Sequence, residues 1–261
     1  VTSLRKNPSV SALLFGDQHK LDAALSVCTD KAILSRIKTQ HCDAVITDDD
    51  DVSVVIRSKR DSSMGLAVKA VADSEADACI SAGHTGALMA LGMVILKTLP
   101  GISRPAICTT FPTSQGRSYM LDLGANLDCS AAQLSQFALL GSLTMQELDN
   151  ITTPRVSLLN VGEEASKGSG VIKQAADLLR DEPLINYCGY VEGDGLFEGD
   201  TDVVVCDGFS GNVALKTSEG VARMIIAMLK DLLASSWPTR LAGLLMLTPL
   251  KLFKARLNPS E

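Results

Sequence analysis

Apolar and polar positions repeat through the middle of the chain as one unit: a short apolar run, a polar glycine-rich loop and a helical pattern. The unit occurs four times, with apolar runs at Ala78–Ser81, Tyr119–Leu123, Val156–Asn160 and Val203–Cys206. The helical patterns that follow are Leu88–Thr98, Ala131–Leu143, Val171–Arg180 and Ala214–Leu233. Nearly continuous apolar strands that alternate with helices are typical of a parallel sheet with both faces covered. We therefore predict a three-layer α/β/α fold with a largely parallel sheet, and earlier strands at Ala12–Phe15 and Ala44–Thr47.

The polar loops of the four units all follow the carboxyl ends of predicted strands. In an open parallel sheet these ends meet at one edge, and the helices that follow present unpaired N–H groups there. One glycine loop often only connects a strand to a helix, but four at one edge predict a binding site for an anion. The residues expected to bind phosphate or substrate are Gly83, His84, Thr85, Gly86, Asn126, Asp207, Gly208 and Gly211.

The C-terminal part has a different pattern, from which we predict a helical hairpin. A long apolar helix at 221–233 is followed by a break at Trp237-Pro238, an apolar run at 241–247 and a basic segment. The run is too short to cross a bilayer. Either Leu244, Leu245 and Leu247 dip into anionic lipid, or the helices pack against a second subunit. We accordingly divide the chain into an α/β/α catalytic domain, 1–220, and a segment for dimer or membrane contact, 221–261.

Composition narrows the classes of function. With 24 Lys and Arg against 30 Asp and Glu, a net charge of −6 and 4% aromatic residues, the chain lacks the basic face and stacking platforms of a nucleic-acid binder. Seven cysteines without Cys-x-x-Cys spacing and only three histidines predict neither a disulfide framework nor a metal site. No dinucleotide fingerprint follows a strand, so we predict no cofactor. Cysteines used as small buried side chains and the lack of a secretory signal indicate a cytoplasmic protein.

Motifs of covalent catalysis are missing: the sequence has no Gly-x-Ser-x-Gly elbow and no Walker sequence. The polar loop residues suit the binding of phosphate and the stabilisation of an oxyanion. With phosphate as nucleophile and a thioester as electrophile, no strong base is needed and the thiol leaves readily. Lys167 is then a point-charge anchor for phosphate, and Asn212 a donor to the carbonyl oxygen. The alternatives are a solvated Lys167, an Asn212 that caps a helix before Val213, and a His84 that only bonds within its loop.

The same loops resemble those of the bacterial phosphate acyltransferase family. The similarity rests on residues 81–87, 121–126, 158–164 with Lys167-Gly168, and 202–213 with Leu215-Lys216 and Glu219-Gly220, and extends from roughly Leu13 to Asn258. It implies a homodimeric α/β/α fold related to isocitrate/isopropylmalate dehydrogenases and phosphotransacetylases. It also implies transfer of a fatty acyl chain from acyl-carrier-protein to inorganic phosphate. The product, an acyl phosphate, would be used by a downstream membrane acyltransferase in phospholipid (phosphatidic acid) synthesis.

Carried over by position, the family's motif lysine falls on Lys167 and its motif asparagine on Asn212. Its glycine loops fall on Gly83–Gly86 and Asp207–Gly211. His84 departs from the family, whose members commonly have Asn there, and we expect the chain to lack the family's N-terminal strand and its C-terminal region. Members are cytosolic and associate peripherally with membrane, so the resemblance implies the same location for this chain.

Two other classes of function stay open. One is a related enzyme, either a phosphotransacetylase-like protein that uses acyl-CoA or a metal-dependent decarboxylating dehydrogenase, whose Asp cluster and dinucleotide loop are not evident. The other is a non-catalytic, membrane-associated scaffold. An acidic carrier protein would need a local basic patch on a chain of net charge −6. The candidates are Arg57, Lys59 and Arg60, and a second group of Arg240, Lys251, Lys254 and Arg256.

Overall fold

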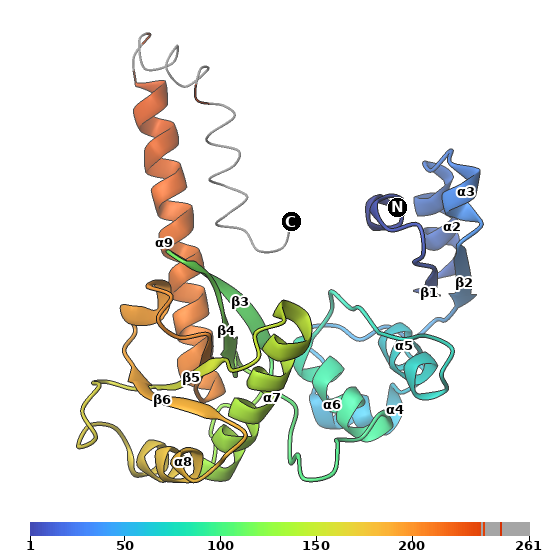
Figure 1. The fold of residues 1–261 in the computed structure, drawn as a ribbon. Helices are drawn as coiled ribbons and strands as arrows, with labels where there is room; N and C mark the ends of the chain where they lie inside the picture. The colour runs from blue at the N-terminus through green and yellow to red at the C-terminus, as the bar shows by residue number, and fades with distance from the viewer. Residues whose placement is uncertain (236, 238–245, 247–261) are drawn as a thin grey trace. The chain divides into compact units, whose positions relative to one another are not determined.

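The chain folds into two compact units, Val1–Pro105 and Ala106–Glu261. The computed structural model describes residues 1–235, 237 and 246. The first unit runs from blue to turquoise in Figure 1 and the second from green to red. Each unit has its own sheet and its own buried apolar clusters. The predicted division of the chain after residue 220 falls within its last described helix and stays a prediction.

The first unit combines a small parallel sheet with short helices. Its elements are α1 (Thr2–Lys6), β1 (Ala12–Gly16), α2 (Gln18–Ser26), α3 (Lys31–Leu34), β2 (Ile37–His41), α4 (Val52–Ser58), α5 (Ser63–Ala72) and α6 (Thr85–Ile95). β1 pairs with β2 in parallel, with Ala12 beside Ile37. Helices α4, α5 and α6 share a separate core around the buried side chains of Val55, Val68 and Leu91.

The second unit is built on a larger, mostly parallel sheet. Its elements are β3 (Cys108–Thr113), β4 (Gly116–Leu121), α7 (Ala131–Asp149), β5 (Arg155–Leu159), α8 (Gly170–Arg180), β6 (Asn186–Val191), η1 (Gly195–Phe197), β7 (Val203–Val205) and α9 (Gly208–Ala234). Within the described residues the strand order is β3-β4-β7-β5-β6. β4, β7, β5 and β6 run parallel, whereas the edge strand β3 is antiparallel to β4. Pro112 lies in this edge strand, where a missing N–H is tolerated.

Helices cover both faces of this sheet. Alternate side chains of the central strand β7 point to opposite faces, so Val203 and Val205 belong to one buried cluster and Val204 to another. Phe137 of α7 lies in the first cluster, and Leu215 of α9 packs against the second. The predicted α/β fold with a mostly parallel sheet is confirmed.

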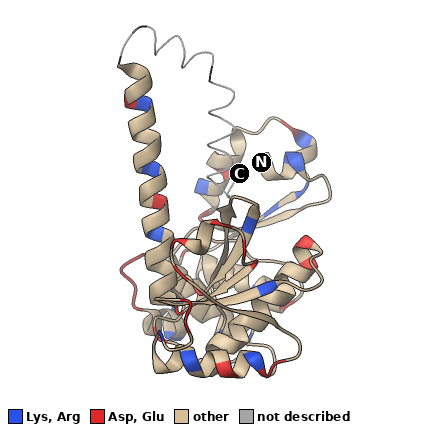
Figure 2. Cartoon of the chain, turned by 60° about the vertical axis from the view of Figure 1, so that its left-hand side comes forward, with Lys and Arg blue, Asp and Glu red and all other residues tan. Residues whose placement is uncertain are grey.

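α9 is a long helix whose first turns pack on the sheet and whose remainder extends past it (Figure 1). Figure 2 shows acidic and basic residues as red and blue segments along it. Glu219 forms ion pairs with Lys216 and Arg223. In the part of the chain that the structure describes, no helix is both long and apolar enough to cross a bilayer. The second arm of the predicted hairpin falls outside the described residues.

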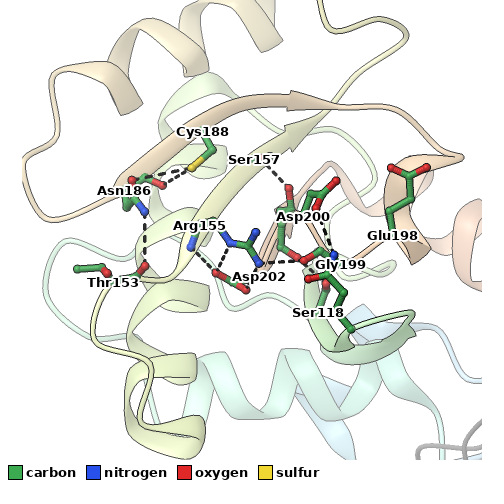
Figure 3. Close-up of polar contacts among 12 residues, drawn as sticks. Ser118, Thr153, Arg155, Ser157, Asn186, Cys188, Glu198, Gly199, Asp200 and Asp202 are labelled. Atoms are coloured by element: carbon green, nitrogen blue, oxygen red, sulfur yellow. Dashed lines mark hydrogen bonds and ion pairs between the residues drawn. The ribbon is translucent and has the colours of Figure 1, made fainter.

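The amino-terminal edge of the larger sheet holds a polar network that joins its strands (Figure 3). The guanidinium group of Arg155, at the start of β5, donates hydrogen bonds of 3.0 and 2.9 Å to the carboxyl oxygens of Asp202, just before β7. The hydroxyl of Ser118 donates to the carbonyl oxygen of Thr201 at 2.5 Å. Burial alone would raise the pKa of Asp202, but the hydrogen bonds from Arg155 outweigh it and hold that pKa below its ordinary value.

The strand predictions for the first unit are partly wrong. β1 is confirmed, but the structure has no strand at Ala44–Thr47 or Ala78–Ser81. Ile46 is instead buried in the core of α4 to α6, and Ile80 is exposed. β2, β3 and β6 were not predicted. Their burial is partial and irregular, so their sequences lack the continuous apolar run that marks a central strand.

The four helical patterns correspond to α6, α7, α8 and α9. Three of these helices begin earlier than predicted, α8 by one residue at Gly170, and α6 and α9 by several residues at Thr85 and Gly208. Thr85, Gly86 and the segment 208–212 are therefore residues of first or second helical turns. The glycine loops that the sequence predicted are shorter in the structure, and their polar residues belong largely to helix N-termini.

Candidate functional site

Three of the four predicted loops lie at one edge of the larger sheet. The neighbouring parallel strands β4, β7 and β5 end at Leu121, Val205 and Leu159. The segments that follow, 122–126, 206–212 and 160–168, therefore share the carboxyl edge of the sheet. The fourth loop, 83–86, belongs to the first unit, so its convergence with the other three stays a prediction.

The loop after β4 is folded around the carboxyl group of Asp122, which is fully buried. Oδ1 accepts hydrogen bonds from the N–H groups of Ile107, Leu123 and Ala125, at 2.9, 2.7 and 3.1 Å. Oδ2 accepts from the N–H and the Nδ2 of Asn126, at 2.6 and 2.9 Å. Burying a carboxyl group is strongly unfavourable without such donors. Asp122 therefore fixes the shape of this loop, and the amides that it binds are not available to an anion.

The start of α9 packs directly on the same loop. The N–H of Gly208 donates to the carbonyl oxygen of Asn126 at 2.8 Å. A Cβ at Gly211 would overlap the carbonyl oxygen of Asp122 and would lie 2.8 Å from the Sγ of Cys206. Glycine is required at these two positions because the helix backbone touches the loop backbone. An anion bound by the Gly208 amide would have to displace this internal hydrogen bond.

Asp207, and not Asn212, is the N-cap of α9. Its Oδ1 accepts from the N–H of Ser210 at 2.8 Å. Asn212 lies in the next turn, where its exposed carboxamide makes no hydrogen bond with another residue that the structure describes. A Cβ placed on Gly124 would be 3.6 Å from the Cγ of Asn212 and 3.7 Å from its Nδ2. The carboxamide of Asn212 therefore lies beside Gly124, and the interpretation of Asn212 as a helix cap is wrong.

Lys167 lies in the loop after β5, whose shape depends on Asn160. The buried Nδ2 of Asn160 donates to the carbonyl oxygens of Gly162 and Lys167, at 2.9 and 3.4 Å. Gly168 has a φ of +88°, a conformation that favours glycine. Lys167 is exposed, and the amides of residues 161–166 form no hydrogen bond within the described part of the chain. The loop therefore combines a lysine and amides without partners among the described residues with the exposed carboxyl groups of Glu163 and Glu164, and its binding of phosphate stays a prediction.

The predicted loop of the first unit is the start of α6. Nδ1 of His84 accepts from the N–H of Ala87 at 3.1 Å, so His84 is the N-cap of this helix. Thr85 and Gly86 form its first turn, and a Cβ at Gly83 would approach the Cε of Met64 to 2.9 Å. His84 therefore makes a local hydrogen bond of the kind that one interpretation of the sequence expected.

Two cysteines next to the site act as hydrogen-bond donors. The Sγ of Cys206 lies 3.3 Å from the carbonyl oxygen of Asp122, and that of Cys129 lies 3.4 Å from the carbonyl oxygen of Asn126. Burial raises the pKa of the Cys206 thiol above its ordinary value and raises the pKa of Cys129 to about 11. Both thiols are protonated at neutral pH, so neither is a ready nucleophile.

The other cysteines only partly match the expectation of burial. Cys28 and Cys42 are buried, but Cys108 and Cys188 are exposed. All seven are free thiols. Among the residues that the structure describes, no group of three or more His, Cys, Asp or Glu side chains is arranged to hold a metal ion.

The surfaces predicted for partners are described only in part. Nζ of Lys59 lies 2.6 Å from Oδ2 of Asp50, so this lysine is already paired, whereas Arg57 and Arg60 are exposed. The second basic group, Arg240, Lys251, Lys254 and Arg256, lies outside the described residues. So do the predicted membrane-contact residues Leu244, Leu245 and Leu247. Their roles stay predictions.

The sequence did not lead us to predict that Asp122 and Asn160 fix the shapes of their loops. The sequence does carry a signal for them, because each is the first polar residue after a buried apolar strand and each precedes a glycine by two residues. A short polar side chain at that point can bond back to the amides of the turn that follows. The pattern predicts a bonded turn, although the partners themselves are visible only in the fold.

Comparison with known proteins gives a consistent result. The family described as "Fatty acid synthesis protein" matches residues 1–261. The "Phosphate acyltransferase" of Hydrogenovibrio crunogenus is 48% identical over 257 residues, covering 98% of this chain and 76% of that protein. The one of Alcanivorax borkumensis is 49% identical over 258 residues, covering 99% and 76%. Among solved structures, the EutD phosphotransacetylase from Staphylococcus aureus has a similar fold, with a TM-score of 0.61, 18% identity, and coverage of 85% of this chain and 77% of that one.

Proposed function

This chain belongs to the phosphate acyltransferase family of enzymes, and from that premise we propose that it transfers a fatty acyl group from acyl-carrier-protein to inorganic phosphate. An oxygen of phosphate attacks the thioester carbonyl carbon, and the carbonyl electron pair moves onto its oxygen. The intermediate collapses with cleavage of the C–S bond, and the carrier thiolate leaves and takes a proton from water. The products are an acyl phosphate and the free carrier.

The observation that carries this proposal is the position of the Asn212 carboxamide beside the turn at Gly124, at the sheet edge where Lys167 also lies. Among the described residues neither this carboxamide nor the amides of 161–166 have a hydrogen-bond partner. Both substrates need such groups, because phosphate is a dianion and the reacting carbonyl becomes an oxyanion. Preorganised donors that meet developing charge are the largest single contribution in many acyl transfers. No strong base is required since the phosphate dianion is itself a nucleophile near neutral pH.

Direct attack by phosphate is favoured over an acyl-enzyme. The thiols nearest to the site, Cys129 and Cys206, are held protonated by burial and are engaged with carbonyl oxygens. Asp207 binds the hydroxyl of Ser210 at 2.9 Å, so that hydroxyl too has a structural partner. We assign Lys167 and the amides of its loop to phosphate, and Asn212 to the carbonyl oxygen. The predicted role of Gly83–Gly86 in substrate binding stays a prediction.

The resemblance to the phosphate acyltransferase family also implies partners for this chain. The acyl phosphate would be used by a membrane acyltransferase in phospholipid synthesis, which suits a protein that touches the membrane peripherally. The exposed arginines Arg57 and Arg60 offer positive charge to an acidic carrier. We also propose a homodimer that forms through α9, because this helix carries exposed apolar side chains.

The test is an assay of the purified protein with phosphate and palmitoyl-carrier-protein, following thiol release and trapping acyl phosphate with hydroxylamine. We expect turnover, and we expect Lys167→Ala and Asn212→Ala each to lower it by about 100-fold with the fold intact by circular dichroism. Lys173→Ala, which removes a lysine charge from the nearby helix α8, is the matched control and should retain activity. Unchanged rates in both site variants would remove the assigned roles.

A second candidate is a phosphotransacetylase that uses acyl-CoA. It is favoured by the fold similarity to a phosphotransacetylase. The same assay with acetyl-CoA in place of the acylated carrier separates the two activities. Turnover of acetyl-CoA without turnover of palmitoyl-carrier-protein would replace the first proposal with this one.

A further inference from the structure

The backbone N–H groups of the loop after β4 differ in their hydrogen bonding. The N–H groups of Leu123, Ala125 and Asn126 all donate to the carboxyl group of Asp122. The N–H of Gly124, between them, makes no hydrogen bond with any residue in the described part of the chain. Gly124 is only partly buried, so its amide is open to a ligand or to water, whereas the neighbouring amides are already paired.

Gly124 is also the residue that lies against Asn212. Its φ of +122° is one that side chains rarely adopt, and a Cβ there would lie 3.6 Å from the Cγ of Asn212, an ordinary van der Waals contact. Asn212 is exposed and its carboxamide is likewise unpartnered among the described residues. The loop and the helix thus bring two free donors, one from the main chain and one from a side chain, to one place.

Asp122 fixes this arrangement from both sides. Its carboxyl group accepts the neighbouring amides of the loop, and its carbonyl oxygen accepts the thiol of Cys206 at 3.3 Å and sits against Gly211 of α9. Its backbone N–H donates to the carbonyl oxygen of Cys206 at 3.0 Å. Movement of Asp122 would shift the loop that carries Gly124 and the helix that carries Asn212.

We propose that the N–H of Gly124 and the Nδ2 of Asn212 together form the oxyanion hole for the acyl thioester, and that Asp122 is the positioning residue that holds the two donors in place. The inference rests on the proposed acyl transfer and adds to it a second donor and its support. As phosphate forms the new O–C bond, the carbonyl oxygen gains the electron pair and accepts both hydrogen bonds. It returns the pair when the C–S bond breaks. Phosphate itself is bound elsewhere, by the loop of Lys167.

If the two groups of donors have these separate roles, variants of the oxyanion hole should change kcat, and variants of the phosphate site should also change the KM for phosphate. Donors that act on the developing oxyanion lower the barrier of the chemical step, whereas donors to phosphate also set its affinity. Gly124→Ala places a side chain on a backbone whose φ of +122° disfavours it, and the new Cβ would lie in ordinary contact with Asn212, at 3.6 Å from its Cγ, so relief of the strained φ would shift the Gly124 amide. We expect kcat to fall by about 100-fold and the KM for phosphate to stay within about twofold.

Asp122→Asn tests the positioning residue. It replaces an acceptor oxygen by an NH2 group in a place where Asn126 offers two donors, so the loop must rearrange, and kcat should fall without a rise in the KM for phosphate. Asp202→Asn makes the same change at the opposite edge of the same sheet and is the matched control, expected to keep the parent kcat at neutral pH. Where Asp122→Asn does not fold, as judged by circular dichroism, the Gly124→Ala result decides.

A double-mutant cycle distinguishes one shared hole from two separate effects. If both donors bind the same oxygen, Gly124→Ala with Asn212→Ala should lose less activity than the product of the two single losses. Independent, multiplying losses would overturn the shared hole, as would a Gly124→Ala enzyme with parental kcat or with a change confined to the KM for phosphate. A parent protein that transfers no acyl group to phosphate would instead overturn the proposed function. The two failures are therefore distinct.

Discussion

Asp202 shows how a single carboxyl group ties the stability of this fold to pH. Hydrogen bonds from Arg155 hold its pKa below the ordinary value of 3.8 although burial acts to raise it (Figure 3). A lowered folded-state pKa means that the charged form is favoured by folding. The contribution is therefore complete at pH values above the unfolded-state pKa, and it is lost as pH falls through the lower folded-state pKa.

We predict that Asp202→Asn lowers the free energy of unfolding at pH 7 by about 1 kcal/mol, since it weakens a charge-assisted pair that is only partly shielded from water. The difference from the parent should shrink as pH is lowered from about 5 towards 2. Urea unfolding across this range measures it. Asp177→Asn, which breaks an exposed pair with Arg180 on α8, should change little at any pH. A difference for Asp202→Asn that grows in acid would contradict the assignment.

At the residue scale, the sequence suggests chemical roles but not contacts, and the roles of Lys167 and Asn212 stay predictions. Lys167 and Asn212 could be chosen because an amine and a carboxamide in strand-end loops suit phosphate and an oxyanion. The carboxyl group of Asp122 could be noticed only as a polar residue after a strand. Its partner Ile107 directly precedes the antiparallel strand β3. Another partner of Asp122, Cys206, lies 84 residues later in the sequence. Contacts of this range depend on the packed sheet and have no local pattern.

At the scale of elements, the junction of α9 with the loop after β4 depends on the absence of a side chain at Gly211. A Cβ there would overlap the carbonyl oxygen of Asp122 and crowd Cys206, and both belong to the packed sheet edge. Neither is the far end of a flexible side chain, so the helix or the loop must move. The position of Asn212, one residue further along, would move with it.

We predict that Gly211→Ala lowers the free energy of unfolding by about 1–3 kcal/mol, as overpacking of a close contact does. Gly220→Ala is the matched control in the same helix, because nothing lies within 4 Å of a Cβ at that position. It should be neutral or stabilise by about 0.5–1 kcal/mol, since alanine favours a helix over glycine. Urea titrations of both variants measure this. Equal effects at the two positions would show that helix propensity, and not the close approach, is what matters.

The elements also show why helices were easier to predict than strands. α7, α8 and α9 satisfy their hydrogen bonds within their own sequence, so an apolar face at helical spacing is enough to mark them. A strand needs a neighbour that the sequence does not name. The apolar run at 78–81 has no strand partner within the first unit as described, whereas β2 pairs with β1 although it carries polar side chains. The availability of a partner strand, and not local composition, therefore decided that the apolar run is no strand and that the polar segment β2 is one.

At the scale of the whole molecule, α9 carries an apolar stripe that the described residues of its own unit leave exposed. Val221, Met224, Ile225, Met228 and Leu232 are each between 44% and 64% exposed. Their spacing of three or four residues places them on one face of the helix. The residues of the ion pairs of Glu219 with Lys216 and Arg223 fall on a different face by helix periodicity. Such a face is typical of a helix that packs against another apolar surface.

A second copy of the chain is the partner that this stripe fits best, because two identical apolar faces are complementary about a twofold axis. We predict that Met228→Glu, which places a charge in the middle of the stripe, converts a dimer into a monomer by sedimentation velocity at micromolar concentration. Ala227→Glu adds the same charge one residue earlier, about 100° around the helix, and should leave the dimer intact. A parent that sediments as a monomer, or a Met228→Glu variant that stays dimeric, would exclude this helix as the subunit interface.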